Sequence, residues 1–415
     1  MKKFIASAGL VAVGTTGLHA AYAPGLSPLE TSKPWSISAT VRGFYDDNYA
    51  TAPSSFTGKK DSYGLELSPS AAINIPLEQT YIGASYVYTM RYYEGRPNHK
   101  FDHSHEATLK LDHEFSERYK LNFNDGFAYS QEPEIIQPTG GGFSIFTRTD
   151  ASALRNRATI NLTAAVTELL SLQPGYQNTF YDFLDSGVGS RSALLDRVEH
   201  LLHIDARYQI REHLVGLAGY QFGMINYTGN EPIILGGPTG EIRDNESHYV
   251  YVGADYALTT QLNATAKAGV QYTTYDHLPG DEVAPYFDLV GSYTYLPGSY
   301  VQLGVRHTRN PTDIVGSSTG VVKDQESTMV YASVNHRLTR EITASLLAQY
   351  QYGVFSGGSF DGLADNFLML GLNVEYRFNP NFAVEAGYNF DRLDSDIANR
   401  SFTRNRIYVG ASATY

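Results

Sequence analysis

The sequence ends with YVGASATY (residues 408–415), in which small or apolar residues occupy every second position. Val409, Ala411, Ala413 and Tyr415 share one face of an extended strand, because successive side chains of a strand point to opposite faces. The last residues of a soluble protein are usually frayed and need no such pattern. The alternation therefore predicts that the C-terminus is itself part of a β-sheet.

The same alternation continues through the sequence from Trp35 onward. It is clear in LNATAKAGVQY (residues 262–272), FLMLGLNVEYRF (residues 367–378) and FAVEAGYNF (residues 382–390). Strict alternation over about ten residues is the signature of a strand, and a tilted strand of about this length can cross the hydrocarbon core of a membrane. The chain is therefore predicted to be all-β, with strands of membrane-spanning length.

The connections between these segments alternate between short and long. Short breaks lie near residues 78–79, 116–118, 168, 212, 261, 297–298, 340–341 and 380. Longer polar stretches lie at residues 48–61, 96–104, 137–153, 186–197, 230–245, 278–283, 313–325, 358–365 and 397–403. The segments between them number about 18, and an even-numbered, antiparallel up-and-down barrel with short periplasmic turns and long extracellular loops has this plan.

A transmembrane sheet has to close, because lipid offers no partners for backbone N–H and C=O groups at an open edge. The last segment is therefore expected to pair with the first, Trp35–Tyr45. Aromatic residues near strand ends are expected to face outward at the two membrane interfaces; these are Tyr81, Tyr119, Tyr256, Phe287, Tyr295, Phe378, Phe390 and Tyr415. The alternative is a soluble β-sandwich or propeller, whose apolar face would pack against a dry core.

The composition agrees with a membrane barrel and excludes several functions. Charged residues make up 18% of the chain, Tyr is abundant at 32 residues, and the net charge is -12. An acidic chain argues against a nucleic-acid partner, because phosphate binding needs a basic surface. The absence of cysteine excludes thiolate catalysis, disulfides and cysteine-ligated zinc.

The first residues have the form of a secretory signal peptide. Lys2 and Lys3 precede an apolar stretch, Phe4–Leu18, which is too short and too interrupted to span a bilayer as a helix. Small residues then favour cleavage after Ala20, with Ala23 as the alternative. The sequence is thus predicted to contain three parts: a signal peptide at residues 1–20, a periplasmic segment at 21–34 and a transmembrane β-barrel at 35–415.

The C-terminal stretch resembles the signal of bacterial outer-membrane proteins that is read by the barrel-assembly machinery. A polar residue, a glycine and two hydrophobic residues make up that pattern, and Tyr408, Gly410, Ala413 and Tyr415 match its places. Ala413 is a weak hydrophobe, and Tyr415 stands where Phe is more common. The resemblance implies that the barrel-assembly machinery is a partner of this chain.

Residues 43–75, GFYDDNYATAPSSFTGKKDSYGLELSPSAAINI, resemble the outer-membrane β-barrel porins of the second "beta-barrel porin" type. The matching residues are Tyr45, Asp46, Asp47, Asn48, Asp61, Ser68 and Pro69, while Tyr49 departs from the family's usual aliphatic residue. Members of this family are called porins or are linked to exopolysaccharide export. The resemblance implies a location in the outer membrane of a Gram-negative bacterium.

The inward face of such a barrel carries its functional information. Alternation places these basic residues inward: Arg42, Arg91, Lys110, Lys120, Arg157, Arg207, Lys267, Arg306, Arg337, Arg377 and Arg406. It places these acidic residues on the same face: Glu66, Asp112, Glu114, Asp205, Asp255, Asp288, Glu375 and Glu385. A barrel of this strand number leaves an aqueous channel unless loops fold into it. The charges then either bias which solutes pass or only pair with one another along the wall.

Three further features have a functional and a simpler interpretation. The loop at residues 137–153 either folds inward to constrict the pore or is a flexible surface loop. The stretch NHKFDHSHE (residues 98–106) is predicted to be a polar loop rather than a metal site, because its spacing fits no helical zinc motif. The acidic stretch DRLDSD (residues 391–396) either binds divalent ions and lipopolysaccharide or is a solvated rim.

No catalytic group is evident, because the histidines are scattered among the strands and no nucleophile elbow is present. The sequence therefore predicts a non-enzymatic barrel of the cell outer membrane, without cofactor or metal. Its predicted function is a porin-like channel for passive diffusion of small hydrophilic solutes. The alternative is a barrel for exopolysaccharide export or binding. Outer-membrane lipid and lipopolysaccharide are expected partners, and the oligomeric state stays open.

Overall fold

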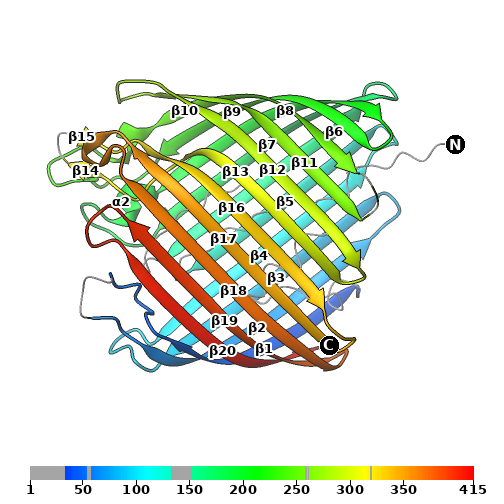
Figure 1. Cartoon of the computed structure of the whole chain (residues 1–415), viewed down its shortest axis with the longest axis horizontal. Coiled ribbons are helices and arrows are strands. Elements are labelled where there is room, and N and C mark those ends of the chain that lie inside the picture. Colours follow the sequence, from blue (N-terminus) through cyan, green and yellow to red (C-terminus); the bar gives the residue numbers. More distant parts are fainter. Residues whose placement is uncertain (1–32, 54–57, 132–151, 258, 260, 318–319) are drawn as a thin grey trace.

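The structure, a computed structural model, describes residues 33–53, 58–131, 152–257, 259, 261–317 and 320–415. These residues form an 18-stranded antiparallel β-barrel (Figure 1). The strands of the barrel are β1 (Trp35–Asp46), β2 (Ser62–Pro76), β3 (Thr80–Tyr93), β4 (Phe101–Glu114), β5 (Tyr119–Ser130), β6 (Ala153–Ala165), β7 (Leu170–Phe183), β8 (Arg197–Arg211), β9 (Leu214–Tyr227), β10 (Asn245–Ala257), β11 (Leu262–Tyr275), β12 (Glu282–Leu296), β13 (Ser299–Asn310), β16 (Asp324–Arg337), β17 (Ile342–Ser356), β18 (Ala364–Asn379), β19 (Phe382–Ser395) and β20 (Phe402–Thr414).

The barrel closes between its first and last strands. β1 pairs with β20 in an antiparallel register that runs from Ser38 opposite Thr414 to Asp46 opposite Arg406. The N–H of Tyr415 donates to the carbonyl of Ile37 at 2.9 Å, so that even the final residue continues the ladder. The predicted closure is confirmed, and so is the predicted number of strands.

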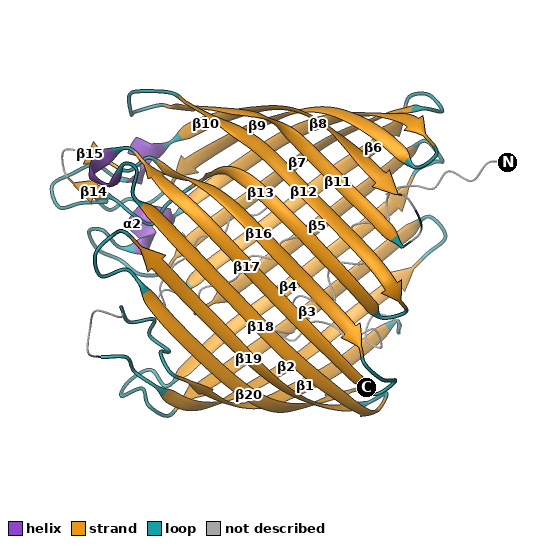
Figure 2. Ribbon diagram, in the orientation of Figure 1, coloured by secondary structure: helices purple, strands orange, loops and turns teal. Residues whose placement is uncertain are grey.

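The two ends of the barrel differ in the length of their connections, as the sequence predicts. At one end the turns are short; β8 and β9, for example, are separated only by residues 212–213. The C-terminus lies at this end (Figure 1). At the other end, longer connections carry a short helix, α2 (Arg191–Leu195), two 3₁₀ turns, η3 (Gly240–Arg243) and η4 (Gly358–Phe360), and the small hairpin β14 (Gly316–Ser317) and β15 (Gly320–Val321) (Figure 2).

The exterior of the barrel is apolar, and the alternation decides which residues face it. Val41, Val250 and Val409 are about half exposed or more, although they lie within strands. Their neighbours in sequence, such as Arg42 and Tyr251, are buried on the inward face. No helix among the described residues is long and apolar enough to cross a bilayer.

An acidic side chain interrupts the apolar exterior in the middle of β5. Asp125 lies on the outward face of β5 between Phe123 and Phe127, because its register partner Leu109 is an exposed outward residue. The side-chain amide of Asn156 on β6 donates to the Asp125 carboxylate at 3.0 Å. This pair gives the carboxylate a hydrogen-bond donor at a position where lipid chains offer none.

Two expectations from the sequence are wrong. His103 and His105 do not belong to a polar loop, because β4 begins at Phe101 and both imidazoles lie on its outward face. The Nδ1 atom of His103 is hydrogen-bonded to the hydroxyl group of Tyr88 on β3, and that of His105 to the hydroxyl group of Tyr86, each at 2.7 Å. These side-chain contacts join β4 to β3 in addition to the backbone ladder.

The second concerns Tyr81, which the sequence predicts to face outward. The phenol of Tyr81 instead donates to Asn74, an almost buried residue of the inward face, at 2.8 Å. The centre of the Tyr81 ring also lies 5.6 Å from the Nζ atom of Lys110. Tyr81 stands one residue after the start of β3, on the same parity as inward-facing Arg91, which accounts for its direction.

The apolar exterior yields a first prediction. Val250→Lys, near the middle of β10 on the lipid side, should lower the free energy of unfolding by about 2–4 kcal/mol, the cost of a basic residue at mid-membrane depth. Ser85→Lys is the matched control, because Ser85 lies near the middle of β3 on the inward face. Denaturant unfolding in detergent or lipid measures both variants, and equal losses would contradict the assignment of the two faces.

Candidate functional site

All the basic and acidic residues that the sequence predicts to be luminal lie on strands, on the face opposite the exposed apolar side chains. Apart from Arg157 on β6, they fall into three groups within the described part of the chain. One group surrounds the seam between β1 and β20, a second lies on the wall formed by β8 to β13, and a third lies near the short-turn end. That these residues line a conducting pore stays a prediction.

The seam group is a compact network of buried ion pairs. Arg42 on β1 contacts Glu66 on β2 at 2.7 Å and Glu385 on β19 at 2.7 Å. Arg91 on β3 contacts the second oxygen of Glu66 at 2.5 Å. Two guanidinium groups and two carboxylates thus alternate across four strands, so that each charge is compensated by direct contacts with opposite charges.

At the long-loop end of the seam, a second set of buried charges joins the first and last strands. The Asp46 carboxylate on β1 is completely buried and receives hydrogen bonds from Arg404 at 2.6 Å and Arg406 at 3.0 Å. Arg406 also donates to the hydroxyl of Tyr93 at 3.0 Å. These charges link β20 to β1 and β3 through side chains, in addition to the backbone ladder.

The opposite wall carries pairs that join residues further apart along the barrel. Lys267 on β11 contacts Asp205 on β8 at 3.0 Å. The pairs Arg207–Asp255 and Arg306–Asp288 are also in direct contact. Three further pairs of predicted inward residues lie near the short-turn end, and they are Lys110–Asp112 at 3.1 Å, Lys120–Glu114 at 2.5 Å and Arg377–Glu375 at 2.7 Å.

Two of the predicted basic residues have uncharged partners. Arg157 on β6 donates to the amide oxygen of Gln177 at 2.6 Å, and it lies within electrostatic range of Arg306 on the far wall. Arg337, at the short-turn end of β16, donates to the backbone carbonyl of Arg340 at 3.0 Å. These two guanidinium groups add positive charge that their hydrogen-bond acceptors do not neutralise.

The residues of the predicted assembly signal occupy both faces of β20. Tyr408 is buried on the inward face, and its hydroxyl donates to Asn373 at 3.1 Å. A Cβ at Gly410 would lie 2.7 Å from the side chain of Arg42 and 2.7 Å from the carbonyl of Val41, so a glycine is required by the close approach of β1. Ala413 and Tyr415 lie on the outward face.

The long-loop end contains functional candidates that the sequence does not reveal. An apolar group, here called the mouth cluster, joins Tyr181 and Phe183 on the inward face of β7 to three residues of α2 and to Ile233 from the β9–β10 connection; its members are Tyr181, Phe183, Ala193, Leu194, Leu195 and Ile233. No sequence pattern predicts this cluster, because it joins the end of β7 to two long connections that are distant from one another in the sequence. It carries the long connections over the inner wall.

Buried charges hold these connections. Arg400, between β19 and β20, contacts both oxygens of Asp313 at 2.8 Å and one oxygen of Asp365 at 2.8 Å. Burial lowers the pKa of the Arg400 guanidinium, but the two carboxylates outweigh it and hold this pKa above its ordinary value. Arg400 is therefore charged at every physiological pH.

Asp196 follows α2 and fixes the helix to the end of β7. Its carboxylate accepts hydrogen bonds from the N–H of Phe183 at 2.7 Å and from the Ser192 hydroxyl at 2.5 Å. Burial raises the pKa of Asp196 to about 6, although both hydrogen bonds oppose this shift. The carboxyl group therefore titrates close to neutral pH.

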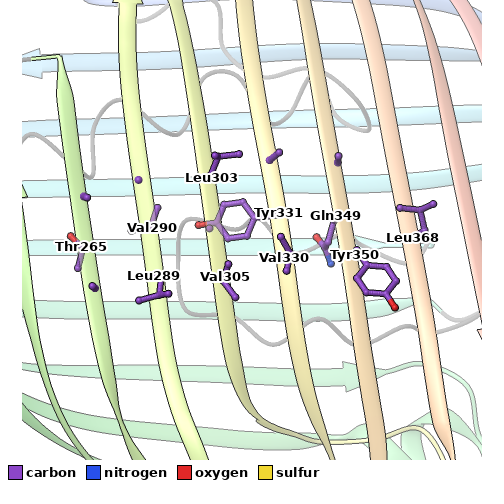
Figure 3. Close-up of a pocket in the computed structure, with 16 residues that line it drawn as sticks. Thr265, Leu289, Val290, Leu303, Val305, Val330, Tyr331, Gln349, Tyr350 and Leu368 are labelled. Carbon is purple, nitrogen blue, oxygen red and sulfur yellow. The ribbon is translucent and has the colours of Figure 1, made fainter.

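A groove of about 630 Å³ lies along the middle of β11–β13 and β16–β18 (Figure 3). Most of its lining residues belong to the outward set, including Leu289, Leu303, Val330 and Tyr350, all of which are well exposed. Small residues such as Ala348 make the depression between them. The groove therefore belongs to the lipid-facing wall and not to the lumen.

The metal and loop hypotheses have different outcomes. Among the described residues, no group of three or more histidine and carboxylate side chains is arranged to hold a metal ion. Most of the loop at residues 137–153, considered as a pore constriction, lies outside the described residues. In the acidic stretch, Asp394 forms an exposed pair with Arg392, whereas Asp391 is almost buried on the inward face.

The seam network yields a second prediction. Glu66→Gln should lower the free energy of unfolding by about 3–5 kcal/mol, because it removes a buried carboxylate charge that contacts two buried guanidinium groups. Glu375→Gln removes a partly exposed pair with Arg377 and should cost less than about 1 kcal/mol. Denaturant unfolding in detergent compares them, and a similar cost for both would show that the seam network does not stabilise the barrel.

Asp196 yields a third prediction. Because its pKa is raised in the folded protein, protonation favours the folded loop, and its contribution to stability is lost as the pH rises from about 4 through about 6. Asp196→Asn removes the charge, keeps an oxygen that accepts from the N–H of Phe183, and replaces the acceptor of the Ser192 hydroxyl by an amide N–H that can donate to it. The substitution should therefore raise the free energy of local opening of the α2 loop at pH 8 and leave it unchanged at pH 4. Hydrogen exchange of the α2 amides measures this, and a pH-independent effect would contradict it.

Several solved structures resemble this chain at low sequence identity. Similar solved structures include a BenF-like porin from Pseudomonas fluorescens Pf-5 (12% identity, covering 92% of this chain and 99% of that chain, TM-score 0.47). They also include OccAB4 from Acinetobacter baumannii (14%, 94% and 100%, TM-score 0.44) and OpdQ from Pseudomonas aeruginosa (12%, 92% and 97%, TM-score 0.46). Likeness at these levels carries no argument about function, and the curated proteins contain no match.

The family comparison is more extensive. The profile of the family described as "Putative beta-barrel porin 2" matches residues 37–415. The match begins at the third residue of β1 and ends at residue 415. The match covers every strand of the closed barrel, with its apolar exterior and charged interior. The chain therefore belongs to this family of outer-membrane β-barrel porins.

Proposed function

We propose that this protein is an outer-membrane channel through which small hydrophilic solutes diffuse passively. The observation that carries the proposal is the distribution of side chains about one closed sheet: large apolar residues face outward, and charged and polar residues face inward. Membership of a porin family supports the same function. A polar interior in an 18-stranded barrel is wide enough to hold water, and water is the medium in which such solutes move.

The mixed charge of the interior is proposed to give a mild preference for anions. Most of the interior charges compensate one another in pairs such as Arg42–Glu66 and Lys267–Asp205, which leaves a weak field. Arg157 is an exception, because its hydrogen-bond acceptor is the neutral amide of Gln177. An unneutralised guanidinium on the lumen wall raises the local concentration of anions.

The main test is electrical. The purified protein in planar bilayers should give steady, ohmic single-channel openings in KCl, and a salt gradient should give a reversal potential that reports the anion preference. A protein that inserts as a heat-modifiable barrel but remains electrically silent would overturn the proposed function.

A fourth prediction assigns the selectivity. Arg157→Gln should shift the reversal potential toward the cation side by several millivolts, because it removes a positive charge from the lumen. Gln177→Glu should shift it in the same direction, since it neutralises Arg157 in place. Arg118→Gln, in an exposed short turn, is the control and should change nothing. An unchanged reversal potential in both lumen variants would separate Arg157 from selectivity.

The alternative function, exopolysaccharide export or binding, has no support from the comparisons. Block of the open channel by an anionic polysaccharide added from one side would revive it, whereas unaffected openings agree with the diffusion channel. The family consists of porins, which are channels rather than enzymes; we propose the same for this chain. We also propose that residues 1–20, which lie outside the described residues, direct export, and that the barrel-assembly machinery and lipopolysaccharide are its partners.

A further inference from the structure

The segment Pro311–Val315, between β13 and β14, is held by two arginines from other connections. Arg243, in η3, donates from Nη1 to the carbonyl of Thr312 at 2.9 Å. Arg400, between β19 and β20, contacts both carboxylate oxygens of Asp313 at 2.8 Å. Pro311–Val315 is called the mouth segment below, and its Thr312 is almost completely buried.

The two arginines are fixed by partners on other elements. Arg243 is completely buried and also donates to the carbonyl of Leu194 in α2. Arg400 is almost buried and also contacts Asp365 at the start of β18. A buried guanidinium that loses one acceptor keeps the cost of its desolvation. The mouth segment is therefore held in one position by contacts that are expensive to break.

The mouth segment also packs against the mouth cluster. Val315 contacts this cluster, which includes Leu194, Leu195 and the inward-facing Tyr181 and Phe183 of β7. The contacts thus join connections that follow β7, β9, β13 and β19, which lie around more than half of the barrel. In Figure 1, α2, β14 and β15 gather at the long-loop end. Because Tyr181 and Phe183 point inward, this assembly lies over the lumen rather than outside its rim.

We propose that the mouth segment forms the extracellular constriction of the channel, and that the Asp313–Arg400 pair is the latch that sets its aperture. This inference rests on the proposed channel function. Asp313 and Arg400 are positioning residues, because they act by holding Pro311–Val315 over the entrance. The size of the largest solute that enters is then decided at this segment, whereas the charged walls further in decide the sign of the preferred ion.

The fifth prediction tests the latch in planar bilayers. Asp313→Asn and Arg400→Gln should each raise the single-channel conductance by about twofold and increase its fluctuations, because a released segment widens the entrance. The size cut-off for neutral polymers that suppress the current should rise in the same variants. Asp313→Glu keeps the charge and should stay near wild type. Arg392→Gln removes a similar pair with Asp394 that is exposed at the same end of β19, and should change nothing.

A second measurement does not depend on weakening the fold. The natural chain has no cysteine, so Ile314→Cys creates a single reactive thiol in the mouth segment. A bulky methanethiosulfonate reagent added to open channels should lower their conductance. Leu235→Cys, a highly exposed position in the β9–β10 connection, is the labelling control and should leave the conductance unchanged.

The outcomes separate the two proposals. If the wild-type protein is silent, the channel function fails and this inference fails with it. If the wild type conducts, but the latch variants keep its conductance and polymer cut-off and labelling at residue 314 has no effect, only this inference is overturned. A latch variant that loses heat-modifiable migration is unfolded, and labelling of Ile314→Cys then decides the inference alone.

Discussion

The structure depends on one constraint: in a hydrocarbon environment, the backbone has to supply its own hydrogen-bond partners. Each barrel strand from β1 to β20 satisfies this by pairing on both sides, and the last gap is filled by the ladder between Ser38–Asp46 and Arg406–Thr414. Because every strand of the barrel has a hydrogen-bonded neighbour on both sides, the side chains of each face need only suit the medium that they contact. The outward set is then selected for lipid and the inward set for water.

The fold could be predicted closely from the sequence because its determinants are local. Period-two alternation identifies a strand without knowledge of its neighbours, and a short break such as residues 212–213 can only be a tight turn. The errors arose where the local signal has two readings. His103 and His105 are polar residues, which favours a loop when the sequence is considered alone. In the structure their imidazoles are hydrogen-bonded to Tyr88 and Tyr86 on the adjacent strand, so they belong to β4.

The interior could be predicted only in part. Alternation indicates which charges face inward, but it does not say which of them meet. Arg42 contacts Glu385, a residue 343 positions away, and Arg157 finds an amide rather than a carboxylate. The contacts of Arg243 and Arg400 are further from local reasoning, because they depend on where four long connections come together. For that reason the residues of the inner wall could be predicted from the sequence, whereas the contacts between the long connections at the entrance could not.

The seam has a consequence for biogenesis. Ser38 pairs with Thr414, so no cylinder exists until β20 lies beside β1. Until then the nascent sheet has two bare edges, which are templates for aggregation with other chains. Pairing of β20 with β1 protects both edges in one step, and a truncation that removed β20 would leave an open ribbon rather than a shortened pore.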